Sequence, residues 1–170
     1  MIPSTLKSAS TLVGLTVMLV VGVAWGWSQV TVPFPGKVEP PPCVDVTFPA
    51  GEEVYPQNVT VSVLNASDRE GLAGFTLQAL VGQGFHEGET GNAPEGTDIR
   101  LAEIWVPGDS TPAVALVKSR FQPVEVRTDV QGLDQPGVVV VVGDDFDDIS
   151  KGRDSVTAKS ETVICGPSVN

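Results

Sequence analysis

Cys43 and Cys165 are the two residues whose type most clearly defines a chemistry in this sequence. They lie far apart, and neither belongs to the C-x-x-C spacing that metal sites and redox motifs use. In an exported chain we expect them to pair, and the loop-entropy model assigns the closure of so long a loop about 4 to 5 kcal/mol. The alternative is a pair of free buried thiols in a cytosolic protein.

A second candidate is the segment that carries Asn65, Ser67 and Gly71, where a predicted strand passes into a predicted helix. A helix N-terminus can bind an anion, but Asp68 and Glu70 would complement the helix dipole themselves and repel phosphate. Ser67, three residues before Glu70, predicts a capping box. Asn65 is expected to fix the turn through backbone hydrogen bonds. If a neutral sugar binds to this protein, we expect it at Asn65, Ser67 and Gly71.

Other polar residues do not form a recognisable catalytic or metal-binding pattern. His86 is the single histidine, so it has no second imidazole with which to bind a metal ion. Aspartates at positions 144–145 and 147–148 flank Phe146 and could hold Ca²⁺, but their spacing is not that of an EF-hand, which favours a solvated acidic turn. No serine stands in a triad order or in a G-x-S-x-G motif. The sequence therefore predicts no catalytic residue, no metal site and no cofactor.

Composition limits the classes of protein that remain. The chain has 170 residues, with 21 acids, 10 bases and a net charge of −11. This size allows one small domain, and the acidic excess argues against nucleic acid as a partner.

The N-terminal region predicts a membrane anchor. Residues 11–32 carry no charge, and their apolar stretch is long enough to cross a bilayer. Lys7 lies before the stretch and Trp25 near its far end, so we expect a single span with residues 1–10 in the cytoplasm. A cleaved signal peptide is the alternative, although the residues after Ala24 offer no small-x-small cleavage site. The membrane is thus the one partner that the sequence itself predicts.

The rest of the chain divides into a linker, a folded domain and a short tail. Residues 33–42 are rich in proline and predict an extended stalk. Residues 43–165 are expected to form one extracytoplasmic domain, and residues 166–170 follow it.

Within this domain, hydrophobic periodicity predicts an α/β fold. The expected strands are 44–48, 59–63, 86–90, 99–106 with an irregularity near Ala102, 124–127 and 138–142, and 155–165 is an extended arm that returns to Cys43. The expected helices are 68–83, and a second one opened by Asp109, Ser110 and Pro112 and continuing to Phe121. Five consecutive valines at 138–142 indicate a central strand that is covered on both faces. The prediction is a mixed β-sheet of four to six strands with two helices, preceded by one transmembrane helix.

One part of the domain resembles a known family. The segment VTVSVLNASDREGLAGFTLQALVGQGF (Val59 to Phe85), the region of Ile99 and the closing VVVVVGDDF (Val138 to Phe146) look like the LytR C-terminal domain. That domain is appended to LytR-CpsA-Psr proteins and also occurs alone behind a single membrane span in actinobacterial envelope proteins. The resemblance implies an extracytoplasmic role in envelope biogenesis or integrity. The catalytic domain of the larger family is absent, so no catalytic residue is carried over.

Taken together, these observations predict a non-catalytic, membrane-anchored envelope protein that acts as a scaffold or interaction module, with envelope-assembly proteins as its partners. The rival is a binding protein for a cell-wall glycan or a lipid-linked envelope precursor. An aromatic side chain such as Trp105 or Tyr55 in a cleft would favour the rival, because sugars stack on aromatic faces.

Overall fold

The computed structural model describes residues 14–23, 25, 43–108, 111–130 and 132–167. The chain divides into two units, Met1–Glu39 and Pro40–Asn170. In the first unit, residues 14–23 are helical. Among the described residues, no helix combines the length and the apolar character that crossing a membrane requires. The expected N-terminus (1–10), stalk (33–42), much of the expected span (11–32) and most of the tail (166–170) lie outside the described residues.

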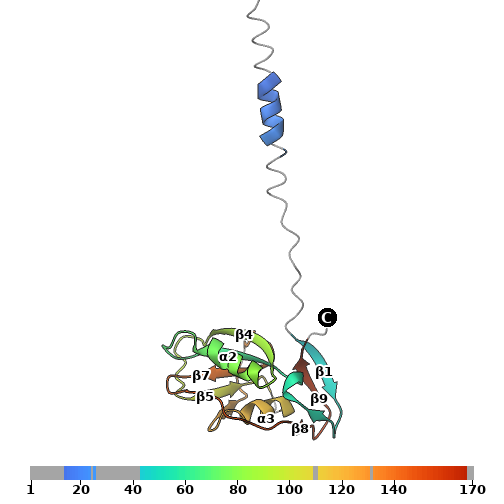
Figure 1. Ribbon diagram of the computed structural model, residues 1–170, viewed down its shortest axis with the longest axis vertical. Coiled ribbons are helices and arrows are strands. Elements are labelled where there is room, and N and C mark those ends of the chain that lie inside the picture. The colour runs from blue at the N-terminus through green and yellow to red at the C-terminus, as the bar shows by residue number, and fades with distance from the viewer. Residues whose placement is uncertain (1–13, 24, 26–42, 109–110, 131, 168–170) are drawn as a thin grey trace, which may run out of the picture. The chain divides into compact units, whose positions relative to one another are not determined.

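A five-stranded mixed sheet forms the centre of the second unit, in the order β4-β3-β7-β5-β6 (Figure 1). β3 (Thr60–Asn65) runs parallel to β4 (His86–Asn92) on one side and to β7 (Val138–Val142) on the other. β5 (Ala102–Trp105) is antiparallel to β7 and parallel to β6 (Glu125–Arg127). The predicted mixed sheet is confirmed in its class and in its number of strands.

β7 is the central strand, as its unbroken run of valines predicted. All five of its residues are buried. Val138, Val140 and Val142 pack into the larger hydrophobic cluster, whereas Val139 and Val141 pack into a second cluster on the opposite face. A strand that is covered on both faces has no position for a polar side chain, which explains its composition.

Two helices cover the same face of this sheet. α2 (Leu72–Gly82) connects β3 to β4, and α3 (Pro112–Lys118) lies between β5 and β6 in the chain. Their buried side chains share one cluster with those of the strands, among them Leu77 and Leu80 of α2 and Leu116 and Val117 of α3. The opposite face is covered by residues outside the helices: Ala66, Ala93, Ile99, Val130 and Leu133.

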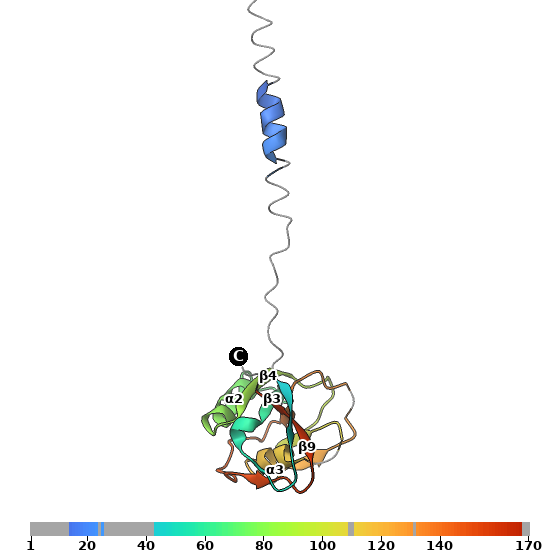
Figure 2. The same ribbon diagram turned by 90° about the vertical axis from the view of Figure 1, so that its right-hand side faces the viewer.

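Two small sheets join the ends of the domain. β1 (Val44–Phe48) pairs antiparallel with β9 (Thr162–Gly166), and the two strands lie side by side in Figures 1 and 2. β2 (Glu53–Val54) pairs with β8 (Val156–Thr157), and a short 3-10 helix, η1 (Pro56–Asn58), leads into β3. The expected return of the C-terminal arm towards Cys43 therefore takes the form of a strand pair outside the main sheet.

The first helix begins later than the sequence predicted. The expected capping box of Ser67 and Glu70 is wrong: the N-cap of α2 is Gly71, and no side chain caps it. The Ser67 hydroxyl accepts a hydrogen bond from the Arg69 N–H at 3.1 Å and is thereby held in the preceding turn. Gly71 has φ of +79°, a left-handed conformation that favours glycine. The helix therefore covers Leu72–Gly82 and not residues 68–83.

Two other boundaries also differ from the prediction. The strand expected at 99–106 begins only at Ala102, so the change of phase that suggested a bulge is the strand's start. Thr111 caps α3, its side chain accepting from the Val114 N–H at 3.4 Å, while the expected cap residues 109–110 lie outside the described residues. Phe121 lies beyond the end of α3 but is buried in the core.

Candidate functional site

The turn between β3 and α2 brings two of the predicted site residues into direct contact. Asn65 Oδ1 accepts hydrogen bonds from the Ser67 N–H at 3.0 Å and from the Ser67 hydroxyl at 2.8 Å. Asn65 Nδ2 donates to the Arg69 carbonyl at 2.8 Å. The third predicted residue, Gly71, ends the turn as the N-cap of α2. The polar side chains of this turn thus determine its conformation, which is the role expected for Asn65.

The acidic turn after β7 forms hydrogen bonds with the turn after β3. Asp144 Oδ1 accepts a hydrogen bond from the Asp68 N–H at 3.1 Å, and Arg69 Nη1 donates to the Phe146 carbonyl. Asp145 forms an ion pair with Arg100 at 2.7 Å. Sequence analysis missed these contacts because they join positions far apart in the chain, and no local pattern indicates them.

The acidic turn does not gather its carboxylates around one point. Phe146 is buried and its ring lies 5.6 Å from that of Phe121, between centroids. Within the described part of the chain, no group of three or more His, Cys, Asp or Glu residues is placed to hold a metal ion. Asp144 and Asp145 instead bind two different protein groups, the Asp68 N–H and the Arg100 guanidinium.

A hollow of about 420 Å³ opens beside the turn, at the carboxyl ends of the parallel strands β3 and β4. Three segments line it: the turn after β3, the end of β4 at Asn92, and the loop that follows β4. The lining residues are Asn65, Ala66, Ser67, Asp68, Glu70, Gly71, Asn92, Ala93, Pro94, Gly96 and Thr97. Crevices at the carboxyl ends of parallel strands are where α/β sheets commonly bind ligands. The sequence analysis did not place Asn92 at this site. A strand–helix–strand unit over residues 60–92 has parallel strands, so recognising this unit would have predicted that Asn65 and Asn92, at the ends of its two strands, lie side by side.

The chemistry of this hollow suits an uncharged polar ligand better than an anion. Its lining holds amides, hydroxyls and two carboxylates, and no cation is among the lining residues. No aromatic side chain lines it either. Trp105 is buried on the second face of the sheet, and its Nε1–H donates to Glu103 at 2.8 Å. Tyr55 lies near the start of η1, and its hydroxyl donates to Glu53, which raises the pKa of the tyrosine.

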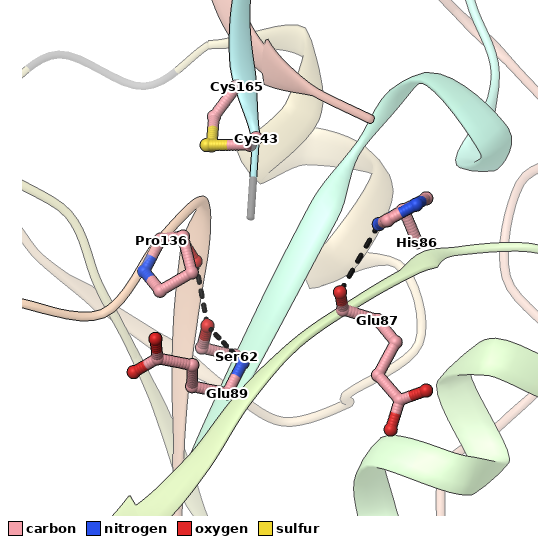
Figure 3. Close-up of a disulfide and its surroundings, with 7 residues drawn as sticks. All are labelled: Cys43, Ser62, His86, Glu87, Glu89, Pro136 and Cys165. Carbon is pink, nitrogen blue, oxygen red and sulfur yellow. Dashed lines mark hydrogen bonds between the residues drawn. A yellow bond between two sulfur atoms is a disulfide. The ribbon is translucent and has the colours of Figure 1, made fainter. Parts of the chain in front are cut away.

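His86 occupies the first position of β4 and makes a local contact. Its Nδ1 lies 3.2 Å from the carbonyl of Glu87, as Figure 3 shows. Ser62, in the same view, is fully buried: its hydroxyl donates to the Pro136 carbonyl at 2.7 Å and accepts from the Glu89 N–H at 3.0 Å. Ser62 therefore links β3, β4 and the turn that precedes β7, which is a structural role.

The two cysteines form a disulfide at the base of the β1–β9 pair (Figure 3). Their Cα atoms are 5.4 Å apart, inside the usual range for such a bond. Because β1 and β9 are the first and last strands of the domain, the bridge closes a loop around the whole sheet.

Comparison with known proteins places this domain in a family. Residues 58–146 match the LytR_C family, described as LytR cell envelope-related transcriptional attenuator. Among solved structures, the chain is similar to the soluble domain of a conserved hypothetical secreted protein from Mycobacterium marinum, at 28% identity, with 61% of this chain and 68% of that chain covered and a TM-score of 0.49. A comparison with curated proteins gave no match. The family match begins at the end of η1, ends at Phe146 and takes in all five strands of the main sheet, so this chain belongs to the LytR_C family.

Proposed function

We propose that this chain is a non-catalytic protein of the cell envelope, anchored by residues 11–32 with its N-terminus in the cytoplasm and residues 43–165 outside. In that position it serves envelope integrity or biogenesis as a scaffold or interaction module. The family description supports the envelope assignment. The apolar, uncharged run at 11–32 supports the anchor.

The observation that carries this proposal is the disulfide between Cys43 and Cys165. Disulfides persist in oxidising compartments and are rare in the cytosol, so a bridge that encloses the whole domain favours export. The turn that follows β3 supports a non-catalytic role, because the polar side chains of Asn65 and Ser67 form hydrogen bonds with each other and with the backbone of the turn.

The topology is tested by adding a protease to intact spheroplasts of a cell that expresses the full chain. The domain should be removed, and a short N-terminal fragment should stay with the membrane. Survival of the full-length chain, with digestion only after the cells are opened, would contradict the proposed orientation.

A second candidate function is recognition of a cell-wall glycan or a lipid-linked envelope precursor in the hollow beside Asn65. The specific observation in its favour is the cation-free, amide-lined surface at the carboxyl ends of β3 and β4. Sugar hydroxyls both donate and accept hydrogen bonds, so amides and carboxylates suit them.

In-cell photocrosslinking separates the two functions. A photoreactive residue replaces Thr97, at the rim of the hollow, and the matched control replaces exposed Asp129 beyond β6, which lies at the other edge of the sheet. Glycan captured at position 97 and not at 129 would select the glycan binder. An envelope-assembly protein captured without glycan would select the scaffold.

A further inference from the structure

A second hollow, of about 620 Å³, lies at the C-terminal end of α3, away from the turn after β3. It is bounded by the last turns of α3, by the chain that leads into β6, and by one residue of the segment after β7. The lining residues are Ala115, Lys118, Ser119, Phe121, Gln122, Pro123, Val124 and Arg153.

The charge of this hollow is opposite to that of the chain. Its lining includes two cations, Lys118 and Arg153, and no acid, in a chain with 21 acids and 10 bases. Other arginines of the domain have protein acceptors: Arg100 pairs with Asp145 and Arg127 with Glu103. In the described part of the chain, neither Lys118 nor Arg153 has a carboxylate within ion-pair distance. Two cations are therefore left for an external anion.

The backbone of Arg153 is held in place by hydrogen bonds to two buried residues, Ser119 and Arg120. The Arg153 N–H donates to Ser119 Oγ at 2.9 Å, and its carbonyl accepts from Arg120 Nη1 at 2.8 Å. Ser150 also binds Arg120: its N–H donates a hydrogen bond to the Arg120 carbonyl at 2.8 Å. Gly152 lies so close to Arg120 and Ser119 that a Cβ there would overlap both side chains. The backbone that presents the Arg153 side chain is thus pre-organised, which lowers the entropic cost of binding.

Arg120 does not line the hollow but hydrogen-bonds to two residues that do, Ser119 and Arg153, and adds a third positive charge next to them. It is 3% exposed, and its guanidinium lies 5.2 Å from the centre of the Phe85 ring. Its Nε is buried without a hydrogen-bond partner. Burial lowers the pKa of Arg120, and the charge of exposed Asp154, which does not line the hollow, opposes that effect.

Ser119 and Gln122 add neutral polar groups to the lining, and its other residues are apolar. Phe121 is buried and packs on Phe146, while Pro123, Val124 and Ala115 supply hydrocarbon surface. A bare inorganic ion would leave this surface unused. An anion attached to an apolar body would use both the cations and the hydrocarbon, since burial of apolar surface adds favourable free energy.

From this geometry we propose that the hollow at the end of α3 binds an organic phosphate, with Lys118 and Arg153 holding the anion and Pro123 and Val124 contacting the apolar part. The site is distinct from the hollow beside Asn65 and does not depend on the function proposed above. Its natural ligand is either a soluble phosphate ester or a phospholipid headgroup, which share this chemistry.

The test measures binding to the full chain in neutral-detergent micelles by titration calorimetry, with phenyl phosphate and inorganic phosphate as probes. Phenyl phosphate should bind saturably and about tenfold more tightly than inorganic phosphate, a difference of about 1.4 kcal/mol. Lys118→Gln and Arg153→Gln should each weaken phenyl phosphate about tenfold, because each removes a charge-assisted hydrogen bond. The matched control is Lys151→Gln, which removes an exposed cation of the same segment that does not line the hollow.

Lys151→Gln should leave the affinity unchanged, and melting curves should show that all three variants are folded. The absence of saturable phenyl phosphate binding would overturn the proposal. So would an equal loss in Lys151→Gln and Arg153→Gln, which would indicate attraction by general charge, or equal affinity for the two probes.

The source of the phosphate is distinguished by repeating the titration in nanodiscs. If phosphatidylglycerol discs weaken phenyl phosphate binding relative to phosphatidylcholine discs, the site is occupied by a lipid headgroup. If the two compositions give the same affinity, the site takes a soluble phosphate ester.

Discussion

The guanidinium of Arg69 donates a hydrogen bond to the backbone carbonyl of Phe146, 77 residues further along the chain. Through this bond the turn after β3 is tied to the turn after β7, and the contact between the Asp68 N–H and Asp144 ties them a second time. The turn that lines the hollow beside Asn65 is therefore held by a second turn, the one after β7, whose residues do not line the hollow.

Arg69→Ala should lower the free energy of unfolding by about 1 kcal/mol, because a partly buried carbonyl loses a charged donor. Arg100→Ala is the matched control, since its ion pair with Asp145 joins side chains that are 84% and 52% exposed. It should cost at most about 0.5 kcal/mol and respond to added salt. Urea unfolding of both variants measures the difference, and equal losses would contradict the structural role of Arg69.

Gly88 and Gly74 should respond in opposite ways to replacement by alanine. A Cβ at Gly88 would lie 2.5 Å from Ser62 Oγ and 2.8 Å from the Val61 carbonyl oxygen, where the register of β3 and β4 shifts. Gly88→Ala should therefore lower stability by about 1 to 3 kcal/mol. Gly74, inside α2, has no neighbouring atom within 4 Å of such a Cβ, so Gly74→Ala should raise stability by about 0.5 to 1 kcal/mol. Thermal unfolding of the two variants compares them directly, and a loss in both would argue against this packing.

Cys43→Ser and Cys165→Ser should destabilise the domain equally, each by about 4 kcal/mol, because either change opens the same loop. The unmodified protein should show no titratable thiol until a reducing agent is added, and reduction should lower its stability to that of the variants. Unequal losses, with one reactive thiol in the oxidised protein, would mean that the two cysteines do not pair.

Tyr55 is the single tyrosine of the chain, so its ionisation can be followed by near-ultraviolet absorbance. The hydrogen bond to Glu53 and the charge of that carboxylate raise the pKa of Tyr55 above its ordinary value of 10.0. The bond is therefore present at neutral pH and is lost as the pH rises through the raised pKa. Glu53→Gln should return the midpoint towards the ordinary value. An unchanged midpoint would show that Glu53 does not perturb the tyrosine.

The elements that the sequence predicted well are those defined by burial. Val138–Val142 could be recognised as central because an unbroken apolar run leaves no exposed face, and α2 because its apolar residues recur at helical spacing. Alternation alone did not reveal which sheet a strand joins: Val44 and Val46 alternate with polar residues, yet both are 36% exposed in the β1–β9 pair.

Features that depend on distant partners could not be predicted. Ser67 and Glu70 have the spacing of a capping box, but a competing bond to Asn65 holds the Ser67 hydroxyl in the turn. The cation-lined hollow combines residues of α3 with Arg153, which the sequence separates by the whole of β6 and β7. In the sequence, Lys118 and Arg153 are only two bases in an acidic chain. The folded structure is needed to show that they line the same hollow.

The position of β7 has a consequence for how the chain is made. Two strand–helix–strand units, β3-α2-β4 and β5-α3-β6, are synthesised first. In the sheet they do not pair with each other, because β7 lies between them, and β7 is the last strand of the sheet to be made. Until Val138–Val142 is made, each half has only two hydrogen-bonded strands. A chain interrupted before Val138 can therefore form two separate strand pairs but cannot join them, and the five-stranded sheet is completed only when β7 has left the ribosome.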